Sequence, residues 1–138
     1  DNIKGCKDTV KNFEHTRKLC NTLLPEFPDF EIYSGFDEFF VHNVLSGGCG
    51  CIGGLTNMCP ELFVEWTKTL NEKNWDKVAE IQNRMMEMFD ISAPFLTAVK
   101  RAMQIRGIIS EEYGKAPLVI ASEKEDEKIR QLLKELDI

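Results

Sequence analysis

The sequence has no long apolar stretch and no excess of basic residues. In its 138 residues, no window approaches eighteen uninterrupted apolar positions, so no membrane-spanning helix is predicted. The chain has 17 basic and 23 acidic residues, a net charge of −6, and the basic residues do not cluster. Nucleic acids and anionic membranes bind clustered positive charge, so neither is expected as a partner. No signal peptide, internal repeat or low-complexity segment is visible.

Metal-binding and phosphate-binding patterns are also scarce. The only two histidines, His15 and His42, fall on predicted helices without a nearby nucleophile. Cys49 and Cys51 have no histidine or third thiolate at the usual spacing of a zinc site, so we expect no metal and no cofactor. The cysteines are typical of small buried residues in a reducing, cytoplasmic setting. The glycine-rich segment 47–50 lacks the lysine and the following helix of a phosphate loop.

The first half of the sequence contains an alternation of strand and helix patterns. Residues 3–7, 30–34 and 49–53 read as short strands, the last almost wholly small or apolar. Two helical faces lie between them. The first, capped by Asn12, contains Phe13, Arg17, Cys20 and Leu24, and the second opens at Asp37 and buries Phe40, Val44 and Leu45. This alternation predicts right-handed crossover units in a parallel sheet.

From Pro60 onward only helical patterns occur. Three apolar faces follow one another: Leu62, Phe63, Trp66 and Leu70; then Trp75, Val78, Ile81, Met85 and Phe89; then, after a start at Ser92-Ala93-Pro94, Phe95, Val99 and Met103. Ser122 and Glu125 have the spacing of a capping box before a last helix with the stripe Ile129, Leu132, Leu133 and Leu136. We therefore predict strand–helix units over residues 1–73 and a helical extension over residues 74–138.

Lys7 is the residue with the most chemical potential. It lies in the segment Gly-Cys-Lys-Asp-Thr, residues 5–9, which we interpret as the end of the first strand. An apolar pocket would favour its free amine, which can attack a ketone and form a Schiff base. The alternative is a lysine at a strand end that points to solvent, as most lysines do.

Three parallel strands are too few to close a barrel. An eight-stranded barrel typically needs about 250 residues, whereas this chain has 138 and begins with Asp1. We therefore expect the C-terminal half of a longer polypeptide. If Ile3, Ile32 and Ile52 face the barrel interior, the open wall needs a partner, either an N-terminal half-barrel or a second copy of the chain, and a homo-oligomer is expected.

Five segments, in order, resemble the dihydrodipicolinate synthase and N-acetylneuraminate lyase family of pyruvate-dependent class I aldolases. The segments are Gly5-Cys6-Lys7-Asp8-Thr9, Ser34-Gly35-Phe36-Asp37-Glu38, residues 48–57, Pro60-Glu61-Leu62, and Ala93-Pro94 with the downstream Val99-Lys100. The resemblance covers the whole chain. It implies an α/β fold, the C-terminal half of a TIM (β/α)8 barrel with strands 6 to 8, followed by a C-terminal helical extension.

The resemblance also implies an activity. Lys7 would form a Schiff base with pyruvate or a 2-oxo acid, in reversible aldol cleavage of a 2-keto-3-deoxy sugar acid to pyruvate and an aldehyde. Dihydrodipicolinate synthase or N-acetylneuraminate lyase activity are alternatives, and a non-catalytic, self-associating half-barrel is an alternative of another class. The family's relay tyrosine and its carboxylate-binding loop belong to the other half, so neither Tyr33 nor Tyr113 is assigned to the relay.

Further site residues follow from the same resemblance. Ile52 would present a backbone carbonyl beside Lys7, and Gly35, Asp37 and Glu38 would face the hydroxyls of the substrate. For Asp37 and Glu38, capping of the helix that begins there remains an alternative. Gly54 stands where the sialic-acid lyases have a serine, which favours an aldolase of other sugar acids.

Overall fold

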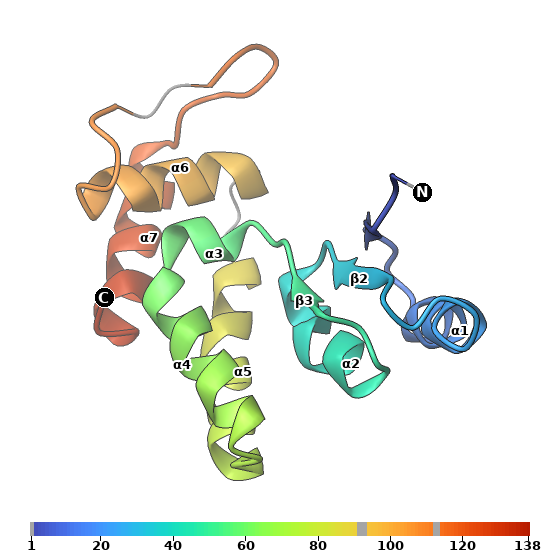
Figure 1. Ribbon diagram of the computed structural model, residues 1–138. Helices are drawn as coiled ribbons and strands as arrows, with labels where there is room; N and C mark the ends of the chain where they lie inside the picture. Colours follow the sequence, from blue (N-terminus) through green and yellow to red (C-terminus); the bar gives the residue numbers. More distant parts are fainter. Residues whose placement is uncertain (1, 91–93, 112–113) are drawn as a thin grey trace. The chain divides into compact units, whose positions relative to one another are not determined.

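The computed structural model describes residues 2–90, 94–111 and 114–138 (Figure 1). Strands and helices alternate as far as β3, and helices follow. The elements are β1 (Gly5–Asp8), α1 (Phe13–Leu23), β2 (Glu31–Ser34), the 3-10 helix η1 (Asp37–Phe39), α2 (Phe40–Leu45), β3 (Gly50–Cys51), α3 (Leu55–Met58), α4 (Pro60–Asn71), α5 (Trp75–Met86), the 3-10 helix η2 (Glu87–Asp90), α6 (Phe95–Ile105) and α7 (Glu123–Glu135). The chain forms two compact units, Asp1–Thr56 and Asn57–Ile138.

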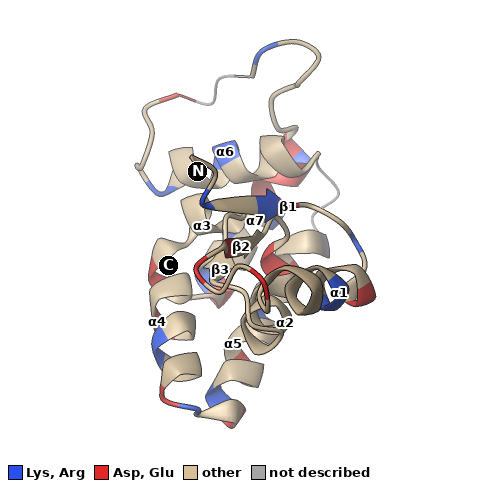
Figure 2. Cartoon of the chain, turned by 45° about the vertical axis from the view of Figure 1, so that its right-hand side comes forward, with Lys and Arg blue, Asp and Glu red and all other residues tan. Residues whose placement is uncertain are grey.

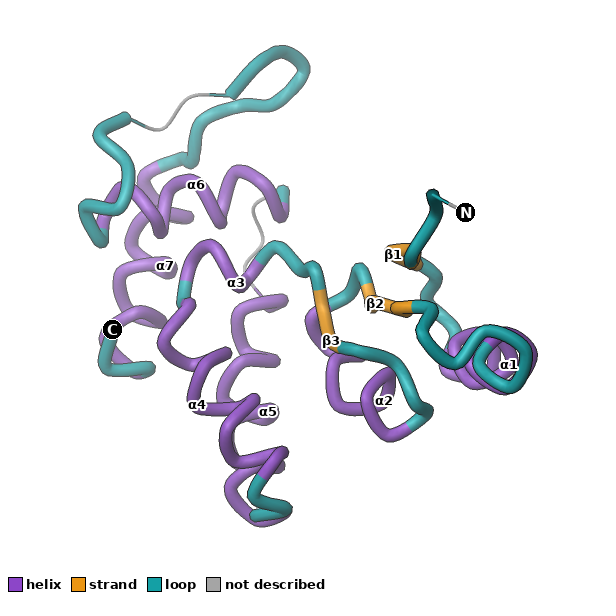
Figure 3. The backbone as a smooth tube through the Cα atoms, viewed as in Figure 1, coloured by secondary structure: helices purple, strands orange, loops and turns teal. Residues whose placement is uncertain are grey.

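The first unit contains a three-stranded parallel sheet in the order β1-β2-β3 (Figure 3). Lys7 pairs with Tyr33, and Tyr33 pairs with Gly50. The predicted parallel sheet is confirmed. The strands are shorter than predicted, however: Ile3 precedes β1, and only Gly50 and Cys51 form β3.

The two faces of this sheet differ in burial. Side chains alternate between faces along a strand, and Cys6 pairs with Ile32, so Ile32 lies on the face opposite Lys7. Ile32 is fully buried, whereas Ile3 and Ile52 are 73% and 50% exposed. The prediction that all three isoleucines face the same side is therefore wrong for Ile32, which packs on the covered side with the helices of this unit.

The helices of the first unit begin where predicted but bury different residues. The side chain of Asn12 accepts hydrogen bonds from the N–H groups of Glu14 and His15, at 2.8 and 3.2 Å, which confirms the cap of α1. In α1, Thr16 is buried and Arg17 is exposed.

Helix α2 has a similar correction. Leu45 is 65% exposed, and Asn43 is buried in its place. The 3-10 turn at Asp37–Phe39 explains the difference, because its tighter winding rotates the face that α2 presents to the sheet.

The second unit packs its helices around Trp66. This side chain is fully buried, and its Nε1 donates to the carbonyl oxygen of Val78 at 3.1 Å, which joins α4 to α5. The predicted stripe of α7 is confirmed, since Ile129, Leu132, Leu133 and Leu136 are all buried. The capping box of Ser122 and Glu125 is also present.

Two aromatic residues of the second unit differ from the prediction. Trp75 and Phe95, each the first residue of its helix, are 51% and 38% exposed. Their position explains this, because the first turn of a helix extends beyond the neighbours that cover its middle. The predicted start at 92–94 lies partly outside the described residues.

The boundary between the compact units follows Thr56, and the predicted domain division after residue 73 stays a prediction. Helix α4 packs against α5 through Trp66, so it belongs to the helical unit. None of the helices in the described part of the chain has the length and apolar character that a bilayer crossing requires. Figure 2 shows acidic and basic residues distributed over many elements.

Candidate functional site

Lys7 and Gly35 meet at the carboxyl end of the sheet. Gly35 follows β2, and its N–H donates to the carbonyl oxygen of Asp8 at 2.7 Å. A Cβ atom on Gly35 would lie 2.9 Å from Cε of Lys7 and 2.0 Å from Oγ1 of Thr9. Because Gly35 has no side chain, the side chains of Lys7 and Thr9 can occupy the space beside it.

Lys7 is not enclosed in an apolar pocket within this chain. The residue is exposed, and its sheet face includes the exposed side chains of Ile3 and Ile52. This corrects the expectation of burial for the chain by itself. The physical reason is the open face of the sheet, since the described helices of this unit bury residues of the opposite face, such as Ile32 and Ser34.

Asp37 is turned away from solvent. Only 3% of the residue is exposed, and its Oδ2 accepts hydrogen bonds from the N–H groups of Gly54 and Leu55, at 3.0 and 3.3 Å. In this chain Asp37 thus binds the backbone that follows β3, and its expected role toward substrate hydroxyls stays a prediction. The structure modifies the capping alternative, because Asp37 binds N–H groups at the start of α3, not at the start of the helix that begins at Asp37 itself.

Burial governs the protonation of Asp37. It raises the pKa of this carboxyl above its ordinary value, and the nearby Glu38 adds to the increase. The hydrogen bonds from Leu55 and Gly54 oppose this shift. A Cβ atom on Gly53 would lie 1.9 Å from Oδ1 of Asp37, so this glycine gives the carboxylate the room to reach the loop.

Glu38 differs from its neighbour in exposure, since Asp37 is buried and Glu38 is partly exposed. Oε2 of Glu38 and Oδ1 of Asp37 are both buried without a hydrogen-bond donor among the described residues. A buried carboxylate oxygen normally has a donor. Glu38 therefore has an acceptor available for a group outside the described chain.

Ile52 and Gly54 continue the chain beyond β3. The N–H of Ile52 donates to the carbonyl oxygen of Ser34 at 2.8 Å, which extends the pairing with β2. Ile52 lies two residues after Gly50, so its side chain is on the Lys7 face. Strand β2 lies between Ile52 and Lys7 in the sheet.

Asn43 is the residue of this region that sequence reasoning missed. It is fully buried on α2, and its Nδ2 donates to the carbonyl oxygens of Ile32 and Gly50, at 2.9 and 2.8 Å. The available signal was a polar residue three positions after Phe40, on the buried side of a short helix. Its amide joins β2 to β3.

Cys51 is not a candidate nucleophile. Burial raises the pKa of its thiol to about 12, and the nearby Asp37 adds to this increase while Lys7 opposes it. A thiol with such a pKa carries almost no thiolate at neutral pH.

The histidines have structural contacts. His15 lies 3.2 Å from Oδ2 of Asp8, and Nε2 of His42 lies 2.9 Å from the carbonyl oxygen of Phe13. In the described ranges, no group of three His, Cys, Asp or Glu side chains is arranged to hold a metal ion.

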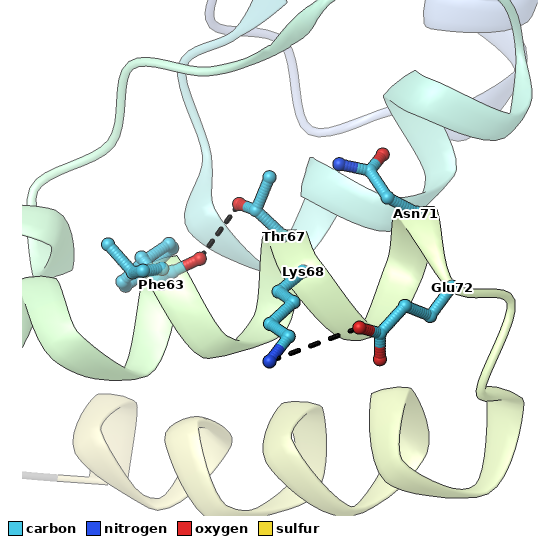
Figure 4. Close-up of a pocket in the computed structure, with 6 residues that line it drawn as sticks. Phe63, Thr67, Lys68, Asn71 and Glu72 are labelled. Carbon is cyan, nitrogen blue, oxygen red and sulfur yellow. Dashed lines mark hydrogen bonds and ion pairs between the residues drawn. The ribbon is translucent and has the colours of Figure 1, made fainter.

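A separate apolar groove lies along α4 (Figure 4). Its lining comes from α4 and the residue after it: Phe63, Val64, Thr67, Lys68, Asn71 and Glu72. Lys68 and Glu72 form an ion pair at 4.0 Å beside it. None of the predicted site residues lines this groove.

The chain is similar to known proteins over nearly its whole length. Residues 1–136 match the family described as the Dihydrodipicolinate synthetase family. The chain is 30% identical over 136 residues to "Probable 2-dehydro-3-deoxy-D-pentonate aldolase YjhH" of Escherichia coli K12, covering 96% of this chain and 45% of that protein. It is 30% identical over 138 residues to an "Uncharacterized DapA-like lyase" of Thermococcus onnurineus, covering 98% and 47%. The chain thus spans about half the length of the curated relatives it matches.

Solved structures are similar over the same extent. The crystal structure of YagE from Escherichia coli K12, a prophage protein of the dihydrodipicolinic acid synthase family in complex with pyruvate, has a TM-score of 0.87 at 25% identity, covering 99% of this chain and 47% of that one. Dihydrodipicolinate synthase of Thermotoga maritima has a TM-score of 0.85 at 28% identity, covering 97% and 46%. The sequence match and the α/β fold agree, and the chain belongs to the Dihydrodipicolinate synthetase family.

Proposed function

We propose that this chain supplies the C-terminal half of a (β/α)8 barrel in a pyruvate-dependent aldolase. The proposed reaction is the reversible cleavage of a 2-keto-3-deoxy sugar acid to pyruvate and an aldehyde. The names of relatives such as the pentonate aldolase of Escherichia coli support this substrate class. The pyruvate in the YagE complex supports the 2-oxo acid.

The observation that carries the proposal is the placement of Lys7 beside Gly35. Active sites of (β/α)8 barrels lie at the carboxyl ends of the strands. The side chain of Lys7 passes Gly35, the residue directly after β2, and so extends toward that end of the sheet. An amine at this edge is in position to meet a bound 2-oxo acid.

Lys7 would act as the nucleophile. Its neutral amine attacks the C2 carbon of the 2-oxo acid, and loss of water gives an iminium ion. The bond between C3 and C4 then breaks, its electron pair moves toward the iminium nitrogen, and the proton of the C4 hydroxyl passes to a base as the aldehyde leaves. C3 of the resulting enamine then takes up a proton, which restores the iminium ion, and water hydrolyses this ion to release pyruvate and the free amine of Lys7. No residue of this chain is assigned as the base.

Other residues would orient the substrate. Glu38, which is more exposed than Asp37 and has an unpaired carboxylate oxygen, would accept a hydrogen bond from a substrate hydroxyl. Asp37 would act indirectly, by holding Gly54 and the start of α3. Gly35 leaves room for Lys7, and the backbone of Ile52 lines the same face of the sheet.

The exposed face of the sheet supports the proposal that another half-barrel covers it. Ile3 and Ile52 are exposed on the Lys7 side, at 73% and 50%. A complementary half-barrel, or a second copy of this chain, would cover this side of the sheet and complete the site, and the enzyme would be an oligomer.

Trapping with pyruvate and borohydride tests the proposal. Borohydride reduces the iminium ion, so we expect a stable pyruvate adduct on Lys7 in the assembled enzyme, mapped by mass spectrometry. Lys7→Arg should abolish the adduct, while Lys4→Arg, at an exposed neighbouring position, should not. An adduct at another lysine, with Lys7 unmodified, would contradict it. Cleavage rates for a panel of 2-keto-3-deoxy sugar acids, N-acetylneuraminate and the dihydrodipicolinate synthase substrates would identify the substrate.

A second candidate is a non-catalytic half-barrel that associates with itself. The exposure of Lys7 and of its sheet face favours this candidate for the chain alone. It predicts a concentration-dependent mass in size-exclusion chromatography without any pyruvate adduct. The aldolase predicts the adduct once the barrel is complete.

A further inference from the structure

Strand β3 is short, and the proposed site residues Ile52 and Gly54 follow it directly. Only Gly50 and Cys51 form it, and Ile52, Gly53 and Gly54 follow directly. Besides the ladder that pairs Gly50 with Tyr33 and Cys51 with Ser34, one backbone hydrogen bond flanks β3 on each side: the N–H of Cys49 donates to Ile32, and the N–H of Ile52 donates to Ser34, both at 2.8 Å. So short a ladder gives little control over the segment that follows.

Asn43 adds a second attachment at the beginning of β3. Its Nδ2 uses both protons, one on the carbonyl oxygen of Ile32 in β2 and one on that of Gly50 in β3. The amide is fully buried, so these bonds do not compete with water. Asp37 makes a corresponding attachment at the other end, through the N–H groups of Gly54 and Leu55.

Gly48 packs directly against the side-chain amide of Asn43, with no room for a side chain of its own. A Cβ atom at position 48 would lie 2.4 Å from Nδ2, 2.5 Å from Oδ1 and 2.6 Å from Cγ of Asn43. Its N–H donates to the backbone carbonyl of Asn43 at 2.8 Å. The glycine therefore lies directly against the amide and leaves it no room to move toward the loop.

We propose that Asn43 is a positioning residue of the aldolase site, whose side-chain amide sets β3 against β2 and thereby fixes the segment Ile52–Gly54, which follows β3 and has the side chain of Ile52 on the Lys7 face. This inference rests on the proposed function. The described side-chain hydrogen bonds of Asn43 go to the backbone of β2 and β3 and not to Lys7, so Asn43 would act through the main chain of β3. Its loss should disturb the binding of the sugar part of the substrate more than the capture of pyruvate on β1.

Amide hydrogen exchange in the assembled protein tests this role without an activity measurement. Asn43→Leu keeps the size of the side chain and removes both donors. We expect the amides of Cys49 and Ile52 to exchange about 10-fold faster, as the loss of a buried hydrogen-bond pair implies. The amides of Glu31 and Gly35, which join β1 to β2, should change by less than about 2-fold. Thr16→Val, at another buried position of the same unit, on α1, is the control and should leave the exchange of the Cys49 and Ile52 amides unchanged relative to that of Glu31 and Gly35.

A double-mutant cycle of Gly48 and Asn43 distinguishes the loss of this specific contact from a general loss of folding. Gly48→Ala displaces the amide of Asn43 without removing it and should give the same exchange pattern. In an Asn43→Ala background the space is free, so Gly48→Ala should then have little further effect. Equal effects of Gly48→Ala in both backgrounds, or equal acceleration of all four amides, would overturn the proposal.

The kinetic readout separates this inference from the proposed function. In Asn43→Leu, the KM for the sugar acid should rise about 10-fold while the rate of pyruvate trapping on Lys7 stays within about 2-fold of wild type. Equal loss of both would mean that Asn43 supports only the fold. If wild-type Lys7 forms no adduct, the proposed function fails, whereas the exchange result still decides whether Asn43 positions β3.

Discussion

The buried carboxylate of Asp37 allows the sharpest prediction about stability. Its Oδ2 is the acceptor for the N–H groups of Gly54 and Leu55. Asp37→Ala removes this acceptor, and the loss of a hydrogen bond to a charged group costs about 1.5–3 kcal/mol. Gly54 is only partly buried, so we expect the free energy of unfolding to fall by about 2–4 kcal/mol at neutral pH.

Asp37→Asn is the matched control. The amide oxygen still accepts a hydrogen bond and no charge is buried, so we expect a change within about 1 kcal/mol. The two variants differ in whether an acceptor remains near the start of α3. Urea unfolding followed by circular dichroism would give the free energy for each variant.

The pH dependence of stability gives a second check on Asp37. Burial raises the folded-state pKa above the ordinary 3.8, so the folded state binds this proton more tightly than the unfolded state does. The resulting stability is present below pH 3.8 and is lost as the pH rises through the folded-state pKa. Wild type should therefore lose stability relative to Asp37→Asn as the pH rises from about 4 to 7. Equal stability of wild type and Asp37→Ala at pH 7, or a wild type that gains on Asp37→Asn with rising pH, would refute the reasoning.

Three further predictions concern the site and the assembly. Gly35→Ala should slow pyruvate trapping at least about 10-fold, because its Cβ would collide with Thr9 and Lys7, and a second change of Thr9→Ala should restore part of the rate. Glu38→Gln should raise the KM for the sugar acid about 10-fold without affecting the adduct, while Glu14→Gln on the exposed side of α1 should change neither. The chain alone should show a concentration-dependent mass in analytical ultracentrifugation, because its Lys7 face is open; a well-folded monomer at all concentrations would contradict this.

The elements with strong periodicity were predictable from the sequence. The stripe of α7 and the core positions of α4 follow the helical repeat and are buried as expected. The parallel sheet follows from the alternation of strands and helices. These features depend on local patterns, which a single sequence contains.

Features that depend on register or on long-range pairing were not predictable. The side of the sheet on which Ile32 lies follows from its pairing with Cys6, and a shift of one residue reverses it. The orientation of Asp37 depends on N–H groups 17 and 18 positions away. The buried bonds of Asn43 likewise reach another part of the chain, and a polar residue on a short helix gives no indication of its partners.

The identity of the Schiff-base lysine is the most direct test of the account. The assembled enzyme, treated with pyruvate and borohydride and then digested, should yield one modified peptide that contains Lys7, and Lys7→Arg should yield none. A reduced pyruvate adduct on any other lysine, with Lys7 unmodified in a complete barrel, would contradict the central claim.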